Sequence, residues 1–181
     1  KQKNKVSDEA TMFINNNRNV KFLLGEYNND KITFKDDIKT SKIYYGIGFD
    51  IHRLIKNKKL YLGGTHIPFH SGLKGHSDGD VILHAIIDAI LGATKKKDIG
   101  TYFPNSKKFK NIRSVKMLKP ILNNLYKFNF FINNLDINLI CEQPKVSKYR
   151  NKILNSISKT LNLNKENINL KGKTVEKLGL I

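Results

Sequence analysis

The sequence predicts an α+β fold in which strands and helices share one hydrophobic core. Short runs with the two-residue period of β-strands are interleaved with long segments that repeat apolar residues at helical spacing. A chain of 181 residues has room for one such domain plus an extension, which argues against a second full domain. Strands interleaved with long helices indicate a sandwich of ferredoxin-like type, with a mixed sheet and helices on one face.

Five strands are expected, at 43–52, 60–62, about 66–69, 135–140 and 168–171. The first begins with the β-prone residues 43–45, and its period of two would point Asp50 and His52 to the same face. Glycines at 63–64 predict a turn after the second strand, and residues 143–145, which include a proline, end the fourth.

Three helices are expected, at 81–93, 114–127 and 149–161. The first is so apolar that it should be largely buried, with Asp78 or Asp80 as its N-cap and Gly92 near its C-terminal end. Pro120 is a candidate kink in the second helix. Residues 98–105 are expected to form a loop, because they have turn chemistry.

Residues 1–42 are rich in lysine and asparagine and carry only scattered apolar residues. They therefore predict an N-terminal extension outside a globular domain that spans residues 43–181. A basic, Asn-rich tail is also what processing can leave of an organelle-targeting leader, which suggests a plastid-type organelle such as an apicoplast. Without such a leader the expected location is the cytoplasm.

The net charge of +18 raises the question of nucleic acid as a partner. Only four of the 33 basic residues are arginine, the side chain that reads bases and clamps phosphates in two-pronged contacts. A solvated lysine face is therefore favoured over a nucleic-acid surface. No apolar run reaches the length of a membrane span, and the single cysteine, Cys141, excludes an intrachain disulfide.

The candidate site is a group of histidines and carboxylates in three short stretches, at 50–52, 76–80 and 84–88. Histidine nitrogen and carboxylate oxygen are ordinary zinc ligands, and a catalytic zinc site typically takes three protein ligands. His84 and Asp88 lie four residues apart on one helical face, so Asp88 could hold the second ring nitrogen of a metal-bound His84.

Each stretch also has a simpler interpretation when it is taken alone. His84 would be a core histidine, the pair at 50 and 52 a surface pair, and residues 77–80 a turn with a helix cap. A buried helix has little reason to carry both His84 and Asp88 unless they are paired or bind something. Together the three stretches predict a divalent metal site.

Several stretches carry a resemblance to a known family: GFDIH at 48–52, GLKGHSDGDV at 72–81, HA at 84–85, DIG with FP at 98–104, and TVEKLG at 174–179. In order and spacing, from about residue 43 to 181, the chain is similar to the 2-C-methyl-D-erythritol 2,4-cyclodiphosphate synthases of the non-mevalonate isoprenoid pathway. The resemblance implies a homotrimer with active sites between neighbouring subunits. It also implies one zinc ion per subunit, bound by Asp50, His52 and His84.

The implied reaction converts 4-diphosphocytidyl-2-C-methyl-D-erythritol 2-phosphate to 2-C-methyl-D-erythritol 2,4-cyclodiphosphate and CMP. By the same resemblance, Glu176 helps hold a second divalent ion, magnesium or manganese, and Thr174 donates a hydrogen bond to the transition state. His76 and Ser77 would contact the substrate phosphates. Taken alone, Thr174 and Glu176 would be a capping pair at the start of a helix.

The resemblance also implies two sets of residues that line the substrate pocket. The residues against the methylerythritol moiety would be Asp98, Gly100, Phe103 and Asn105. The residues of the cytidine and phosphate pocket would be Cys141, Pro144, Lys145 and Lys173. Alone, 98–100 would be only a turn and 143–145 a loop that ends a strand.

The chain departs from the family pattern at a few positions. Asn105, Lys173 and Leu180 stand where the family commonly has aspartate, threonine and an aromatic residue. The sequence stops at Ile181, whereas the family usually continues into a last strand, so that strand is expected to be missing from the given sequence. A protein that truly lacks it would have one sheet edge and part of the phosphate site incomplete, and nothing follows if the strand is only unrecorded.

Three other functions remain open from the residues alone. The first is a zinc-dependent phosphohydrolase that uses metal-bound water. The second is a lysine-rich nucleic-acid-binding module, for which the scarcity of arginine is unfavourable. The third is a trimeric scaffold without catalysis.

Overall fold

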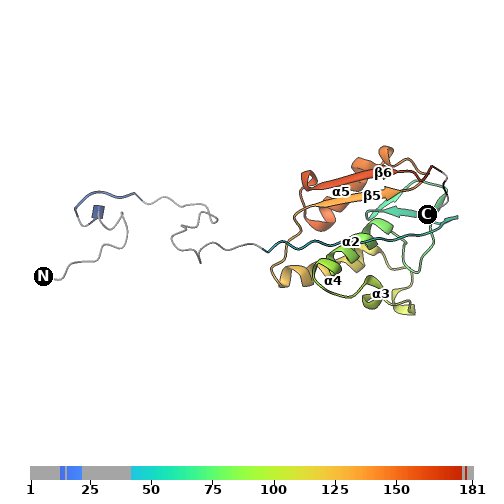
Figure 1. Ribbon diagram of the computed structural model, residues 1–181, viewed down its shortest axis with the longest axis horizontal. Helices are drawn as coiled ribbons and strands as arrows, with labels where there is room; N and C mark the ends of the chain where they lie inside the picture. The colour runs from blue at the N-terminus through green and yellow to red at the C-terminus, as the bar shows by residue number, and fades with distance from the viewer. Residues whose placement is uncertain (1–12, 15, 22–41, 177, 179–181) are drawn as a thin grey trace. The chain divides into compact units, whose positions relative to one another are not determined.

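The structure is a computed structural model that describes residues 13–14, 16–21, 42–176 and 178. The chain divides into two compact units, Lys1–Lys42 and Ile43–Ile181. The second unit contains the named helices and strands and is the subject of this section (Figure 1). The predictions for Leu180 and for the chain end at Ile181 concern positions outside the described residues.

The second unit combines helices with strands, which confirms the α+β class. Its strands are β1 Leu54–Lys56, β2 Leu60–Leu62, β3 Thr65–Ile67, β4 Ser71–Leu73, β5 Leu135–Ile140 and β6 Ile168–Lys173. Its α-helices are α2 Val81–Ala93, α3 Ile99–Tyr102, α4 Ser114–Lys127 and α5 Arg150–Leu161. Short 3-10 turns lie at η2 Lys107–Phe109, η3 Val146–Lys148 and η4 Lys165–Asn167.

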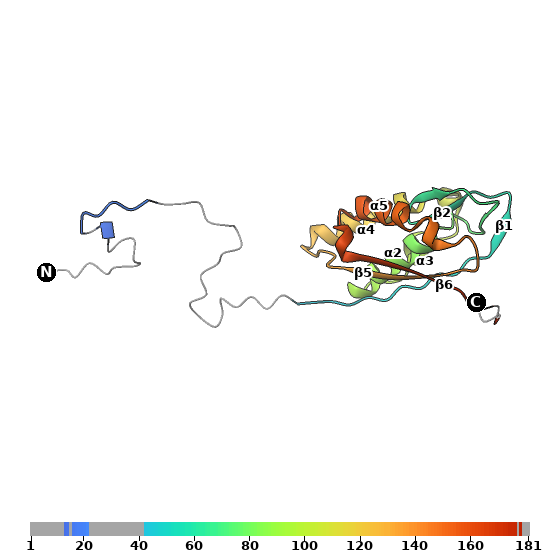
Figure 2. The same ribbon diagram turned by 90° about the horizontal axis from the view of Figure 1, so that it is seen from above.

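The described strands pair as three separate ladders rather than one mixed sheet. β1 pairs with β4 and β2 with β3, both antiparallel, while β5 and β6 run parallel over six residues each. In Figure 2, α4 and α5 lie on the same side of the β5–β6 ladder. The ferredoxin-like arrangement therefore stays a prediction, because its single sheet is not among these pairings.

The strand predicted at 43–52 is wrong for the described structure. Residues 42–53 have no strand assignment, and regular pairing starts only at Leu54. The segment instead runs against α2, where glycines at 46 and 48 allow close contact. A Cβ atom added at Gly46 would lie 1.9 Å from the carbonyl oxygen of Ala89, and one at Gly48 would lie 1.8 Å from that of Ala85.

The core lies between α2, α4, α5 and the strands. Almost every face of α2 is buried, and its members Leu83 and Ile87 are inaccessible to solvent, as are Leu118 of α4 and Ile153 of α5. This explains why α2 is apolar nearly all round, which is typical of a helix with neighbours on all sides. No helix in the described part of the chain is long and apolar enough to span a membrane.

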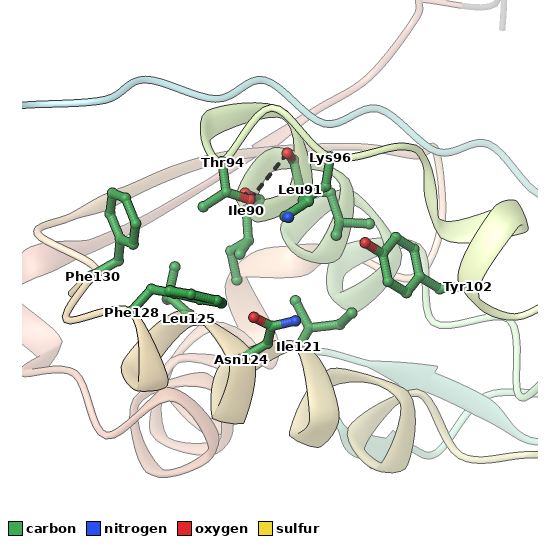
Figure 3. A pocket seen from close by; sticks show the side chains of 10 residues that line it. All are labelled: Ile90, Leu91, Thr94, Lys96, Tyr102, Ile121, Asn124, Leu125, Phe128 and Phe130. Atoms are coloured by element: carbon green, nitrogen blue, oxygen red, sulfur yellow. Dashed lines mark hydrogen bonds between the residues drawn. The ribbon is translucent and has the colours of Figure 1, made fainter.

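A cavity of about 220 Å³ lies between the C-terminal ends of α2 and α4 (Figure 3). Its apolar wall includes Ile90, Leu125 and Phe128, and Thr94 lies at the end of α2. His84 sits ten residues before Thr94, which corresponds to about 15 Å along a helix. The cavity is therefore separate from the candidate metal site.

Candidate metal centre

Three potential ligand atoms converge at the start of α2, as the sequence predicts. The Oδ2 atom of Asp50 lies 2.8 Å from Nδ1 of His84 and 3.1 Å from Nε2 of His52. The two ring nitrogens are 3.5 Å apart. Ligands of a tetrahedral zinc ion with bonds of about 2.1 Å are separated by roughly 3.4 Å, so small adjustments would let these atoms share one ion. The donor set of one carboxylate and two imidazoles also fits zinc.

Two separate segments bring these ligands together. His84 lies on the first turn of α2, and Asp50 and His52 lie on the segment that packs on that helix through Gly48. Asp80 starts α2 as its N-cap, since its carboxylate accepts the backbone N–H of Leu83.

The carboxylate of Asp80 also ties α2 to the turn between β2 and β3. It accepts N–H groups from Gly63 at 2.8 Å and Gly64 at 2.6 Å. Both glycines have positive φ, so the predicted turn is confirmed. One buried carboxylate thus fixes the end of α2 that carries His84.

The cluster favours the negatively charged form of Asp50 beside the two imidazoles. Burial alone raises the pKa of Asp50, but hydrogen bonds from His52 and His84 outweigh it and hold that pKa well below its usual range. The hydrogen bond to Asp50 raises the pKa of His52, against the opposing effect of burial. A metal ion at these three atoms must displace the protons that the imidazoles share with the carboxylate.

The prediction that Asp88 holds His84 is wrong. Its Oδ1 atom accepts the backbone N–H of Ile99 at 2.7 Å, and so anchors the start of α3 instead. The Nε2 atom of His84 lies 3.1 Å from Oγ of Ser77 and 2.9 Å from Oγ of Ser114. The spacing of four residues puts Asp88 on the same face of α2 as His84. Tertiary packing nevertheless directs Nε2 of the His84 ring toward Ser77 and Ser114 instead.

Ser114 is a residue of this site that the sequence analysis missed. It is the first residue of α4, thirty positions from His84 along the chain. A serine at the start of a helix normally suggests a cap, and no local pattern pairs it with a distant histidine.

His76 and Ser77 occupy different surroundings although they are adjacent. Ser77 is buried behind His84, and its hydroxyl also accepts the N–H of Gly79 at 3.1 Å. The Nε2 atom of His76 is 2.6 Å from the carbonyl oxygen of Ser106, which ties it to the loop before η2. Ser77 therefore lies at the metal cluster, and His76 lies on the loop beside it.

The loop predicted at 98–105 contains one helical turn, α3, because Asp98 caps it. Its carboxylate accepts both the backbone N–H and the hydroxyl of Thr101, and these contacts lower the pKa of Asp98. Phe103 packs edge to face on Phe109, with the ring centres 5.4 Å apart. Gly100 and Asn105 are exposed.

A second group forms at the carboxyl ends of the parallel strands β5 and β6. The backbone N–H of Cys141 donates to the carbonyl oxygen of Lys173 at 2.9 Å. The Cys141 thiol donates to the carbonyl oxygen of Pro144 at 3.6 Å. Lys145 and Lys173 are exposed. The residues expected for the cytidine pocket therefore come together, at the strand end where ligands commonly bind in open parallel sheets.

Thr174 and Glu176 follow directly after β6. The Thr174 hydroxyl donates to the Glu176 carboxylate, and the N–H of Val175 donates to the Glu142 carboxylate at 3.2 Å. Neither residue caps a helix among the residues described. No hydrogen bond described for the second unit joins this group to the metal cluster.

Comparisons with known proteins show the family to which the chain belongs. The model of the YgbB family matches residues 43–181. A bifunctional enzyme IspD/IspF of Pelagibacter ubique is 52% identical over 178 residues, which is 97% of this chain and 48% of that protein, so the chain spans about half the length of this relative. The 2-C-methyl-D-erythritol 2,4-cyclodiphosphate synthase of Hydrogenobaculum is 52% identical over 132 residues, covering 72% of this chain and 85% of that protein.

A solved structure of IspF from Plasmodium falciparum in complex with CDP is also similar. It has a TM-score of 0.66 and 42% sequence identity, and it covers 76% of this chain and 85% of that chain.

Proposed function

Because the chain belongs to the YgbB family, we propose that it is a cyclodiphosphate synthase that converts 4-diphosphocytidyl-2-C-methyl-D-erythritol 2-phosphate to 2-C-methyl-D-erythritol 2,4-cyclodiphosphate and CMP. The observation that carries the proposal is the convergence of Asp50, His52 and His84 within the matched residues. The direct experiment is to incubate the purified protein with this substrate and to detect CMP together with the cyclic product. A protein that releases no CMP under metal-replete conditions would contradict the proposal.

The reaction needs no protein nucleophile. An oxygen of the substrate's 2-phosphate forms a bond to the β-phosphorus, while the bond from that phosphorus to the oxygen bridging it to the α-phosphate breaks, and CMP leaves. Zinc held by Asp50, His52 and His84 would supply positive charge that stabilises the charge developing on phosphate. The protein's own contribution is then to hold the reacting phosphates in line and to donate hydrogen bonds to them.

Thr174 and Glu176, which follow β6, are the residues proposed to act on the substrate diphosphate. The hydroxyl of Thr174 would donate to the transition state, and the carboxylate of Glu176 would help hold a second ion, magnesium or manganese. Their mutual hydrogen bond supports the proposal, since it keeps both groups at one place on the chain. His76 and Ser77 would complete the phosphate contacts from the metal side.

The exposed loop around α3 is proposed to hold the methylerythritol moiety. Asp98 stays ionised and could accept hydrogen bonds from the hydroxyl groups. Phe103 would cover the carbon skeleton, with Gly100 leaving room beside it and Asn105 as a further polar contact. The bond from Ile99 to Asp88 supports this role, because it fixes the loop to α2.

The cytidine pocket is proposed at the ends of β5 and β6, where backbone groups beside Cys141 and Pro144 could read the base. CDP is a suitable probe, because it is bound in the related Plasmodium falciparum structure. We expect Lys145→Ala to weaken CDP binding about tenfold, because it removes a cation from a phosphate. Calorimetric titration would measure this change.

The matched control for that titration is Lys119→Ala. Lys119 is an exposed lysine of α4, so its loss lowers the net charge equally without touching the proposed pocket. An equal loss of CDP affinity in both variants would mean that general charge, rather than a pocket, attracts the nucleotide.

A homotrimer is proposed from the surface of the segment that precedes β1. Its odd-numbered residues expose large apolar side chains: Ile43, Tyr45, Ile47, Phe49 and Ile51. The exposed fraction reaches 86% for Tyr45 and 92% for Ile47. Five exposed apolar side chains along one short segment favour contact with another protein surface. A neighbouring copy would also bring a second set of pocket residues to each metal cluster.

We expect Ile47→Glu to shift the protein toward monomer, because the added carboxylate would lose its hydration in the subunit contact. Light scattering coupled to size-exclusion chromatography would give the mass. The control is Phe131→Glu, which places the same charge on an exposed aromatic outside this segment. A parent protein that is monomeric at micromolar concentration would contradict the trimer.

Residues 1–42 have a further proposed origin. Since the alignment with the bifunctional IspD/IspF enzyme covers 97% of this chain, it includes most of these residues. This favours a segment shared with bifunctional relatives over an organelle leader, and the plastid location stays a prediction.

A further inference from the structure

The geometry points to Ser114 as a positioning residue for the metal site, with a hydroxyl that holds His84 in the tautomer and orientation that leave Nδ1 open to a metal. This inference rests on the proposed metal-dependent function, and it assigns a role to a contact that joins the start of α4 to α2. The inference depends on a chain of hydrogen bonds that joins His84 to Ser114 and Ser114 to Asp78.

The first step is the contact on the far side of the His84 ring. While Nδ1 lies 2.8 Å from the Asp50 carboxylate, Nε2 lies 2.9 Å from Oγ of Ser114 and 3.1 Å from Oγ of Ser77. The two ring nitrogens therefore face different partners. The hydrogen bond made at Nε2 decides which of the two nitrogens keeps its proton when the ring binds a metal.

The second step is the direction of the hydrogen bonds. The Ser114 hydroxyl also contacts Oδ1 of Asp78, and a carboxylate can only accept, so the hydroxyl proton points to Asp78. The oxygen of Ser114 then has only lone pairs to offer to His84. The ring therefore donates from Nε2, and the proton on Nδ1, which the Asp50 carboxylate accepts in the metal-free protein, is the one that a metal ion would displace.

The third step concerns the contacts that hold the Asp78 side chain in place. Its Oδ2 atom accepts Nε of Arg113 at 2.8 Å and the backbone N–H of Ser114 at 3.0 Å. The guanidinium of Arg113 lies 3.7 Å from the ring centre of Tyr61, and its Nη2 donates to the carbonyl oxygen of Gly64 at 3.0 Å. The acceptor of the Ser114 proton is thus held by Arg113 and Ser114, and Arg113 is itself fixed by its contacts with Tyr61 and Gly64.

Because these three residues are buried, water cannot readily replace the hydrogen bonds between them. Ser114 is fully buried, and Asp78 and His84 are at most 8% exposed. In such surroundings each hydrogen bond is stronger than it would be in water, and the loss of an acceptor leaves a donor unpaired. Groups that orient metal-bound histidines in this way typically change metal affinity by roughly 10- to 100-fold when they are removed.

The test compares three variants of the full chain with the parent. Ser114→Ala removes the hydroxyl, Ser114→Thr keeps it, and Ser71→Ala removes another buried serine hydroxyl, one that pairs with Nδ1 of His70 at 2.8 Å outside the cluster. The probe is zinc alone, with its dissociation constant measured by competition with a chromophoric chelator. Thermal unfolding of the metal-free proteins reports any general loss of stability.

We expect Ser114→Ala to bind zinc 10- to 100-fold more weakly, while Ser71→Ala stays near the parent and Ser114→Thr recovers most of the affinity. Nitrogen-15 spectra of labelled histidine should show the proton on Nε2 of His84 in the zinc-loaded parent. A Ser114→Ala affinity equal to that of the parent, or an equal loss in Ser71→Ala, would overturn the inference. If the parent itself binds no zinc, the proposed function fails first and the inference with it.

Discussion

Replacing His84 with alanine is expected to lower the rate of CMP release by about a thousandfold or more and to strip zinc from the purified protein. His84 supplies one of the three converging ligand atoms, and two remaining ligands hold zinc poorly. A bound metal typically supplies several kcal/mol of charge stabilisation to a phosphoryl transition state, and each 1.36 kcal/mol corresponds to a factor of ten in rate. Metal analysis and CMP detection on the same preparation would measure both effects.

His66→Ala is the matched control for that variant. His66 lies on β3, exposed and outside the metal cluster, and its ring contacts Tyr61. It should keep zinc and turnover near the parent values. Undiminished CMP release by a zinc-free His84→Ala protein would contradict the account.

Gly48→Ala is expected to have the second largest effect, on both stability and zinc binding. A Cβ atom at this position would lie 1.8 Å from the backbone carbonyl oxygen of Ala85, so the segment and α2 must separate. Overpacking of this kind typically costs about 1–3 kcal/mol, and here the obstacle is backbone that cannot change rotamer. Because Asp50 follows two residues later, the displacement should also weaken zinc binding by roughly tenfold or more.

The control for Gly48→Ala is Gly92→Ala, at a glycine on the α2 side of the contact between this helix and residues 46–48. Gly92 of α2 faces the carbonyl oxygen of Ile47, but a Cβ atom there would lie at an ordinary 3.8 Å. Gly92→Ala should therefore leave zinc binding intact and raise the free energy of unfolding by roughly 0.5–1 kcal/mol, since alanine favours a helix. Chemical denaturation would measure both variants, and equal stability of Gly48→Ala and the parent would show that the segment does not pack tightly on α2.

The helices were predictable because their signals are local. The bounds of α2 and α4 agree with the predicted ranges 81–93 and 114–127, and Asp80 caps α2 as one of the two predicted candidates. Pro120 lies inside α4, which continues past it to Lys127. The predictions for β2, β5, β6 and α5 also hold, with shifts of no more than two residues at their ends.

The strand predicted at 43–52 failed because a strand needs a partner that the local pattern does not specify. The two-residue period is present in the side chains, yet the structure describes no ladder for this segment. The strand β4 was missed for the opposite reason, since a run of serine, glycine and leucine at 71–73 has little β-propensity of its own.

The three metal ligands were predictable because aspartate and histidine are themselves common zinc ligands. Asp50, His52 and His84 come together as expected, because carboxylate and imidazole side chains at these spacings have few other reasons to meet. The partner of the second His84 nitrogen was not predictable, because Ser114 reaches it only through the packing of α4 on α2.

The most direct test of the central claim is to run the reaction in water enriched in oxygen-18 and to examine both products by mass spectrometry. Intramolecular attack by the substrate's own phosphate predicts that neither CMP nor the cyclic diphosphate carries solvent oxygen, and that a chelator stops the formation of both. A linear 2-C-methyl-D-erythritol 2,4-bisphosphate, or CMP, that carries oxygen-18 would show that water attacks instead, and would contradict the proposed cyclisation.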